Sequence, residues 1–220
     1  MPDFTYEEKW KAAGYTTICG VDEAGRGPLA GPVCAAAVIL PYGCVIDGLD
    51  DSKKLSEKKR ESLFDVIERT AVACSIAFAS VEEIEVHNIL GATFLAMRRA
   101  VGGLAVPADF VLIDGNAAPD GLNLPCETVV KGDAKSMSIA AASVLAKVSR
   151  DRLMDEYDRR YPEYGFAKHK GYGTKLHNQA ILAYGPTPIH RRKFLRKLLG
   201  TEGERSRNRQ DAPSSPETEG

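Results

Sequence analysis

The sequence predicts an α/β or α+β protein in which helices cover a β-sheet. Two observations support this prediction. Two apolar runs near the start of the chain have the length of buried strands, and further runs of this kind then alternate with longer helical patterns. A chain of 220 residues, 44% of them hydrophobic, can bury one full core. We therefore expect one domain over residues 1–200, followed by a polar tail.

The individual elements follow from these patterns. Apolar runs predict five strands, at residues 16–21, 33–40, 72–80, 110–113 and 127–131. Amphipathic spacing predicts three helices, at residues 53–70 with Ser56 as the N-cap, at residues 81–101, and at residues 135–160 before Pro162. The small residues 140–143 would let the third of these helices lie close against the sheet. Short helical pieces follow, and residues 201–220 have almost no apolar side chain, so we expect disorder there.

The composition is that of a soluble globular protein, with a formal net charge of −1. No apolar run approaches the roughly 20 residues of a membrane span. Residues 1–15 lack the basic and apolar regions of a secretory signal. The five cysteines form no CxxC pair, and most fall in or beside predicted strands, where free cysteine acts as a small apolar residue. We expect a cytoplasmic monomer with no membrane partner.

The charge is unevenly distributed along the chain. Lys and Arg clearly outnumber Asp and Glu between residues 147 and 197. Solvated helix faces would explain such a surplus. A surface that faces the phosphates of a nucleic acid explains it better, and we favour that interpretation.

Four acidic residues lie at places where we expect a turn to expose them. Asp22 and Glu23 follow the first predicted strand, Asp114 follows the fourth, and Asp133 precedes the long helix. If the two strands lie side by side and parallel, Asp22 and Asp114 meet at one sheet edge, where carboxylates repel each other unless a hard divalent cation holds them. Alternatively, the acids only terminate strands and Asp133 caps the helix. Two adjacent acids after a buried strand argue against that simpler view.

All-oxygen ligands of this kind favour Mg²⁺ or Mn²⁺. The four histidines are too scattered for a zinc site. Two divalent ions about 4 Å apart activate water and stabilise the leaving oxygen of a phosphodiester. The chain has no GxSxG elbow and no GxxxxGK[ST] loop, so acyl transfer and P-loop chemistry fit poorly.

Glycines and one tyrosine are candidate substrate contacts. The segment 25–32, GRGPLAGP, lacks the GxGxxG spacing and precedes a strand, so its glycines indicate tight turns and close approach to a ligand. Tyr172 lies between two glycines in the basic segment HKGYGTKLH. A lone tyrosine is usually packing or surface, but one placed here is better suited to stack on a sugar or base.

Taken together, these segments closely resemble the bacterial ribonuclease HII family. The resemblance rests on motifs that occur in order over about residues 18–194, namely VDEAGRGPLAGPV, DDSKKLS, LIDGN, KGD, SIAAASVLAKVSRD, HKGYGT and GPTPIHRR. Each short motif is weak alone, but the ordered set is highly specific. It implies a ribonuclease H-like fold, with a mixed five-stranded sheet flanked by helices and a small C-terminal helical extension.

The resemblance also implies an activity. Enzymes of this family cut RNA in RNA–DNA hybrids and cut on the 5′ side of single ribonucleotides in duplex DNA, leaving 3′-OH and 5′-phosphate ends. They use divalent ions, here Mg²⁺ or Mn²⁺, two with substrate bound. A type 1 ribonuclease H or a resolvase would share the acids but ignore an isolated ribonucleotide. A non-catalytic nucleic-acid binder would have little reason to keep four clustered acids.

Residue by residue, the family motifs assign roles in this chain. The four catalytic carboxylates match Asp22, Glu23, Asp114 and Asp133. The segment that reads the ribose 2′-OH through its backbone matches Gly25, Arg26 and Gly27, and the tyrosine that packs on the sugar at the RNA–DNA junction matches Tyr172. Phosphate contacts match Lys53 and, less closely, Asn88. The tail, residues 201–220, has no counterpart in the motifs, and the binding of a replication partner by it stays open.

Overall fold

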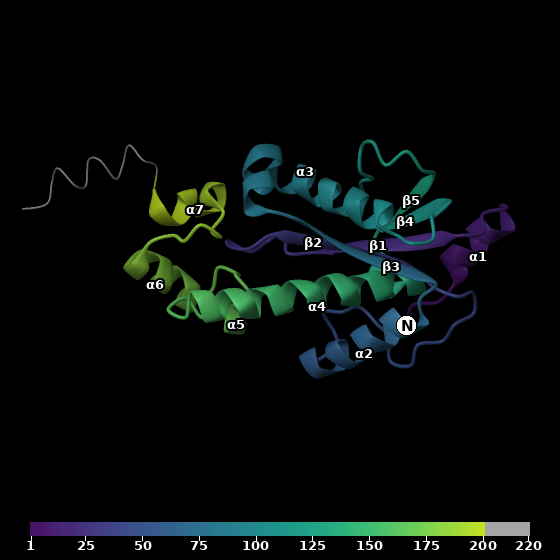
Figure 1. Ribbon diagram of the computed structural model, residues 1–220, viewed down its shortest axis with the longest axis horizontal. Coiled ribbons are helices and arrows are strands. Elements are labelled where there is room, and N and C mark those ends of the chain that lie inside the picture. The colour runs from purple at the N-terminus through teal and green to yellow at the C-terminus, as the bar shows by residue number, and fades with distance from the viewer. Residues whose placement is uncertain (201–220) are drawn as a thin grey trace, which may run out of the picture.

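The five expected strands form one mixed sheet in the computed structural model, which describes residues 1–200 (Figure 1). The strands are β1 (Ile18–Ala24), β2 (Val33–Ile39), β3 (Ala73–Ala79), β4 (Phe110–Asp114) and β5 (Cys126–Val129). Their order in the sheet is β3-β2-β1-β4-β5. β1 pairs antiparallel with β2 and parallel with β4, so the centre of the sheet joins an antiparallel half to a parallel half. The expected tail and its replication partner concern residues 201–220, outside the described part.

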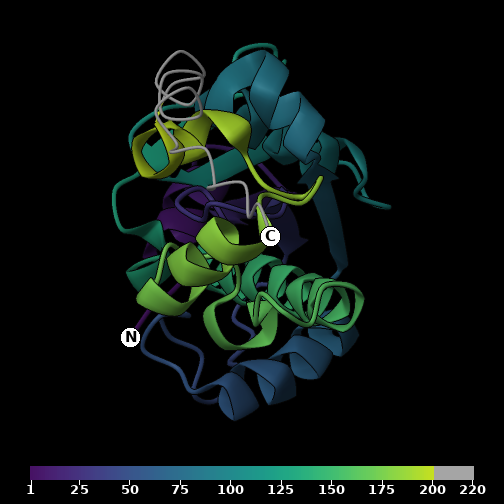
Figure 2. The same ribbon diagram turned by 90° about the vertical axis from the view of Figure 1, so that its left-hand side faces the viewer.

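Helices cover both faces of this sheet. They are α1 (Thr5–Ala12), α2 (Glu57–Thr70), α3 (Val81–Gly102), α4 (Met137–Arg160), α5 (Phe166–His169), α6 (Lys175–Tyr184) and α7 (Arg192–Leu199), with a short 3-10 helix η1 (Gly132–Ala134) before α4. Figure 1 shows α3 on one face and α4 with α2 on the other. The small helices α5 to α7 gather beyond one end of the sheet, where Figure 2 shows α7 beside α3 and α6 beside α4. No helix within residues 1–200 combines the length and apolar character needed to cross a bilayer.

The close packing of α4 on β1 fixes the position of the first acidic pair. Residues 140–142, all alanine, are fully buried, as the small-residue face predicted. The backbone of α4 approaches so closely that a Cβ at Gly20 would lie 2.2 Å from the carbonyl carbon of Ser138. Only glycine fits at this position, and the contact places the next residues of β1 directly against α4.

Several local expectations need correction. β1 does not end at Val21 but continues through both acids to Ala24, because these residues pair with β2 from Cys34 to Ala36. The N-cap of α4 is Ser136, whose hydroxyl accepts from the Ile139 amide, so Asp133 is not the helix cap. α1, which the sequence patterns did not predict, packs against the start of α4, where Glu7 accepts from the Ser136 hydroxyl and the Ser138 amide. Ser56, by contrast, caps α2 as predicted.

Candidate active site

The structure brings the four acids together at one place, the carboxylate site (Asp22, Glu23, Asp114 and Asp133). Val21 pairs with Ile113 in the parallel β1–β4 ladder, so the acids that follow them lie on neighbouring strands. Side chains alternate along a strand, and the Val21 and Ile113 side chains belong to the core on the α3 face, so Asp22 and Asp114 point toward α4. The prediction that the two strands lie parallel and side by side is therefore confirmed, but Asp22 lies within β1 and Asp114 is the last residue of β4, so no turn exposes these two acids.

Burial in this site is unequal. The exposed fractions of Asp22 and Asp133 are only 4% and 3%. Glu23 and Asp114 are half-buried. Asp133 comes from η1, and the η1 amide of Gly132 donates to Oδ1 of Asp114 at 2.6 Å. This bond connects the third and fourth acids across the gap between β4 and α4.

The electrostatics of the site show an excess of negative charge. Burial raises the pKa of Asp22 well above its usual range, and the charges of Glu23 and Asp114 raise it further. Burial is also the main cause of the raised pKa of Glu23 and of Asp114, and Asp133 adds to the effect on Asp114. Ionising all of these carboxyl groups together is unfavourable unless positive charge is supplied.

Two side chains of the protein supply part of that charge. Lys53 Nζ lies 3.1 Å from Oδ2 of Asp133, and Arg26 lies 3.3 Å from Oε1 of Glu23. Although partial burial lowers the pKa of Lys53, its hydrogen bond to Asp133 and the nearby acids raise it overall. Both cations are largely exposed, so they can move aside for another cation or for substrate phosphate.

The donor chemistry of the site fits hard divalent cations. All four ligand candidates are carboxylates, and three of them have raised pKa values that a cation would relieve. As the side chains stand, residues 1–200 contain no group of three or more His, Cys, Asp or Glu already arranged as a metal site. A cation would therefore have to displace the two ion pairs and draw the carboxylates inward.

A chain of hydroxyl groups connects Asp22 to the loop that carries Lys53. The Ser143 hydroxyl on α4 lies beside the Asp22 carboxylate and favours its charged form, which lowers the pKa of Asp22 in part. Ser143 Oγ lies 2.7 Å from Ser52 Oγ, and both serines are buried. The Ser52 carbonyl in turn accepts from Arg60 of α2 at 3.0 Å. This chain holds the Lys53 loop over the carboxylate site.

The glycine loop (residues 25–32) continues directly from β1 and lies against Tyr172. A Cβ at Gly27 would be 3.5 Å from Cε1 of the tyrosine ring, an ordinary van der Waals contact. The Tyr172 side chain is 46% exposed, so its ring is available to a ligand. The glycine loop thus follows the first two acids directly in the chain and contacts Tyr172.

Comparison with known proteins agrees with this geometry. A family model described as Ribonuclease HII matches residues 19–197. The ribonuclease HII of Syntrophotalea carbinolica is 57% identical over 189 residues, covering 86% of this chain and 90% of that protein. The ribonuclease HII of Geobacter sulfurreducens is 54% identical over 197 residues, covering 89% and 90%. This chain belongs to the ribonuclease HII family.

Solved structures of this group share the fold. The ribonuclease H2 of Pyrococcus horikoshii superposes with a TM-score of 0.71 at 26% identity, covering 87% of this chain and 99% of that one. Bst-RNase HIII in complex with Mn²⁺ has a TM-score of 0.55 at 16% identity, covering 77% and 63%, and shows the fold alone. The ribonuclease H-like fold is therefore confirmed, and membership in the ribonuclease HII family makes this chain a ribonuclease H-type nuclease.

One residue matched to the ribonuclease HII motifs has a different local role in the structure. Asn88 adopts φ 59° and ψ 174° and divides α3 into two helical segments. Its side-chain oxygen accepts from the amides of Leu90 at 2.9 Å and Gly91 at 3.2 Å, so it caps the second segment. None of the hydrogen bonds or ion pairs of Asn88 in residues 1–200 reaches the carboxylate site.

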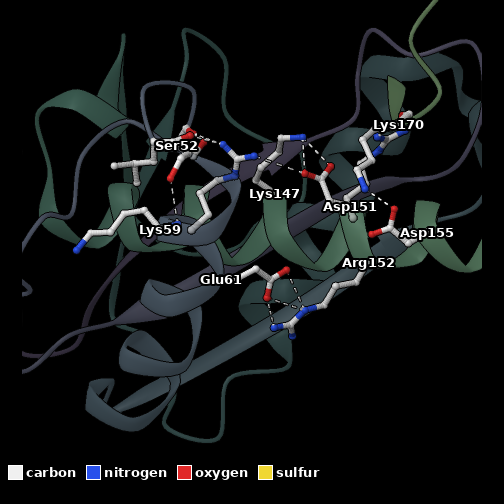
Figure 3. Close-up of polar contacts among 12 residues, drawn as sticks. Ser52, Lys59, Glu61, Lys147, Asp151, Arg152, Asp155 and Lys170 are labelled. Carbon is white, nitrogen blue, oxygen red and sulfur yellow. Dashed lines mark hydrogen bonds and ion pairs between the residues drawn. The ribbon is translucent and has the colours of Figure 1, made fainter. Parts of the chain in front are cut away.

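The basic region is only partly a free surface. Along α4, Lys147 is bonded to the buried Asp151, and Lys170 is paired with Asp155 (Figure 3). Arg152 bonds Glu61 of α2 at 2.5 Å. Arg152 and Lys170 thus join different segments of the chain, and Lys147 is paired within α4, so the surplus that faces a nucleic acid is smaller than the sequence indicates.

Sequence reasoning missed several residues that shape the site. The sequence gives Ser143 only as one of the small residues of a helix, and it gives Ser52 no role beyond the DDSKKLS motif. Arg150 and Arg191 were counted as surface charges, yet both are buried, with exposed fractions of 1% and 0%. Local patterns carry no signal for such burial, because most partners of these side chains lie 91 or more residues away in the chain.

Proposed function

We propose that this chain cuts the phosphodiester bond on the 5′ side of a ribonucleotide, both in RNA–DNA hybrids and at a single ribonucleotide in duplex DNA. The family supports hydrolysis of the RNA strand of hybrids. One observation favours the finer activity: a single strand end carries Asp22 and Glu23 and then leads directly into the glycine loop, against which Tyr172 lies.

We propose that Asp22, Glu23, Asp114 and Asp133 hold two divalent ions, Mg²⁺ or Mn²⁺. When bound, such ions lower the pKa of water and stabilise charge on the phosphate. A structure of the same fold that was solved with Mn²⁺ is consistent with this choice of ion. The residues of the chain then hold the ions in place, and Lys53 leaves Asp133 to meet a substrate phosphate.

Recognition of the sugar falls to the neighbouring residues. The backbone of Gly25, Arg26 and Gly27 would bond the 2′-OH, the group that distinguishes RNA from DNA. A deoxynucleotide would leave these backbone groups unpaired, which costs binding energy. Tyr172 would pack on the sugar at the junction between RNA and DNA.

A cleavage assay tests the proposal. Wild-type protein with Mg²⁺ or Mn²⁺ should cut a duplex with one ribonucleotide and leave 3′-OH and 5′-phosphate ends. Asp22→Asn should lose about a thousandfold or more of this activity, comparable to losing a main electrostatic stabiliser. Asp65→Asn, at an exposed position on α2, is the matched control and should retain full activity.

Two results would contradict the proposal. Cleavage of long hybrids with no cleavage at a single ribonucleotide would indicate type 1 behaviour. Full activity of Asp22→Asn would exclude the carboxylate site as the catalytic centre.

A further inference from the structure

Arg191, at the start of α7, is a fully buried arginine whose guanidinium bonds only backbone carbonyls of the glycine loop. Its exposed fraction is 0%. The acceptors are the carbonyls of Gly25 at 2.6 Å, Pro28 at 2.8 Å, Arg26 at 2.9 Å, Gly31 at 2.9 Å and Pro32 at 3.2 Å. One side chain thus gathers five carbonyl groups from eight consecutive residues of this loop.

Arg150, from α4, binds the same loop from another side. It donates to the carbonyls of Ala30 at 3.0 Å, Pro32 at 3.0 Å and Lys170 at 2.9 Å. A Cβ at Gly25 would lie 2.0 Å from Nε of Arg150, so the loop passes directly over this guanidinium. The last of the three carbonyls belongs to the segment that leads into Tyr172.

Neither guanidinium has a carboxylate partner within residues 1–200. Burial, and then the charge of Arg150, lowers the pKa of Arg191 to about 9. Two buried positive charges side by side are costly to desolvate, and their hydrogen bonds to the loop carbonyls offset that cost. These bonds determine how the carbonyls of the loop are oriented.

The orientation of these carbonyls also fixes the amides on the other side of each peptide plane. Because the carbonyls of Gly25, Arg26 and Pro28 turn inward to Arg191, the peptide planes between them are fixed in orientation. The amides of Arg26 and Gly27 donate to no other group in the described part of the chain. Because N–H and C=O point in opposite directions in a trans peptide, these amides point away from Arg191 and remain available to a ligand.

Tyr172 is tied to the same framework. The Leu29 amide donates to the Gly171 carbonyl at 2.8 Å, and the Arg191 amide donates to the Leu29 carbonyl at 2.8 Å. The Tyr172 carbonyl accepts from Nδ1 of His177 at 2.9 Å, and His177 Nε2 lies 3.0 Å from Nε2 of His190. His190 directly precedes Arg191, so one short segment holds both recognition elements.

We propose that Arg191 is a positioning residue that sets ribose specificity, because it orients the amides of Arg26 and Gly27 toward the 2′-OH and fixes the glycine loop against Tyr172. This inference rests on the proposed function of the glycine loop. Arg191 itself does not touch the substrate. Lysine cannot replace it, since an ammonium group has three donors and no planar fork to hold five carbonyls.

The test compares binding of two duplexes in metal-free buffer, where no cleavage interferes. Fluorescence anisotropy gives the affinity for a duplex with one ribonucleotide and for the same duplex in all-DNA form. For Arg191→Lys the ratio of the two affinities should fall about tenfold, which corresponds to about 1.4 kcal/mol, because the hydrogen bonds from the two amides to the 2′-OH are misaligned. Affinity for all-DNA should stay within about twofold, since phosphate contacts are unchanged.

Arg98→Lys is the matched control. Arg98 also donates to a backbone carbonyl, that of Asp120 at 2.9 Å, but this contact involves neither the glycine loop nor the segment of Tyr172. Its substitution should leave the ratio unchanged. A merely structural role of Arg191 would instead weaken binding of both duplexes equally.

Each outcome decides the matter. An unchanged ratio in Arg191→Lys, or equal losses on both duplexes, overturns the inference. If circular dichroism shows this variant unfolded, Arg150→Lys loosens the same loop and must lower the ratio; unfolding of both variants overturns the inference. If wild-type protein itself shows no preference for the ribonucleotide, the proposed reading of the 2′-OH fails instead.

Discussion

The carboxylate site and the glycine loop with the Tyr172 segment, which Arg150 and Arg191 bind, both contain buried groups of like charge. The two regions differ in what stabilises these charges. The two buried arginines are bonded to fixed carbonyls of the chain itself. Within residues 1–200, Asp22 accepts from the Glu23 amide at 2.7 Å and lies beside the Ser143 hydroxyl, and its pKa stays raised. The conformation of these loops is therefore fixed by the chain itself, whereas the acids keep negative charge that exchangeable cations can neutralise. Under the proposed function, the groups that recognise the substrate would be fixed in advance, and metal binding would depend on exchangeable cations.

The largest expected effect on stability concerns the glycine loop. Gly25 has φ 99°, and a Cβ there would overlap Arg150, so Gly25→Ala should lower the free energy of unfolding by about 3 kcal/mol or more. At Gly27 a Cβ meets only ordinary contact, so Gly27→Ala should change it by less than about 0.5 kcal/mol. Urea denaturation of both variants measures the difference. Equal effects would mean that Arg150 does not fix the loop.

Acid should affect the two regions with opposite sign. Burial lowers the pKa of His177 and of His190 to about 4, so the unfolded chain binds protons first below pH 6.5. This contribution to the free energy of unfolding is complete above pH 6.5. As the pH drops toward 4, it falls by about 3 kcal/mol for one of these two histidines. The acids with raised pKa values take up protons first in the folded state, which opposes the loss.

Denaturation at several pH values separates these contributions. Asp22→Asn removes part of the opposing effect, so its stability should fall more steeply with acid than that of wild-type protein. A His87→Gln variant, at an exposed position, should follow the wild-type curve. A wild-type curve that is flat from pH 6.5 to 4, together with an equally flat Asp22→Asn curve, would contradict buried neutral histidines.

Removing the charge of Asp22 from the carboxylate site should have a smaller effect on stability at neutral pH. Asp22→Asn removes a buried charge beside other acids, so the Tm in metal-free buffer should rise by a few degrees even though cleavage is lost. Differential scanning calorimetry measures this change. A clear drop in Tm would show that the ionised Asp22 is already well satisfied without a cation.

The smallest expected effect concerns the junction contact. Tyr172→Ala should lower kcat/KM on a duplex with one ribonucleotide by about tenfold, the scale of one aromatic stacking contact. A long hybrid should be affected less, because it offers many equivalent sites. Tyr42→Ala removes a tyrosine of similar exposure elsewhere and should change neither substrate. Equal losses on both substrates would argue against a junction role.

Much of the fold could be predicted from the sequence because it depends on local patterns. The apolar runs gave all five strands, and Ser56 was identified as a helix cap. The end of β1 was placed too early, because Asp22 and Glu23 look like turn residues, whereas pairing with β2 carries the strand through them. Tertiary pairing overrode the local preference.

The sequence allowed the four acids of the site to be predicted, but not the buried residues that hold the neighbouring loops in place. The four carboxylates stand out because paired acids beside buried strands are rare without a cation. Arg191 does not stand out, since arginine is normally exposed and its acceptors lie about 160 residues earlier in the chain. The hydroxyl chain from Ser52 to Asp22 likewise depends on contacts that only the folded chain creates.

The most direct test of the contrast between the two regions is a carbon-13 NMR titration of the side-chain carboxyl groups in metal-free protein. Asp22→Asn assigns the Asp22 resonance. We expect the pKa of Asp22 to lie well above the usual range for aspartate, and to fall when Mg²⁺ is added with the duplex substrate. An Asp22 that titrates at or below the usual range without metal would contradict a carboxylate site that depends on exchangeable cations.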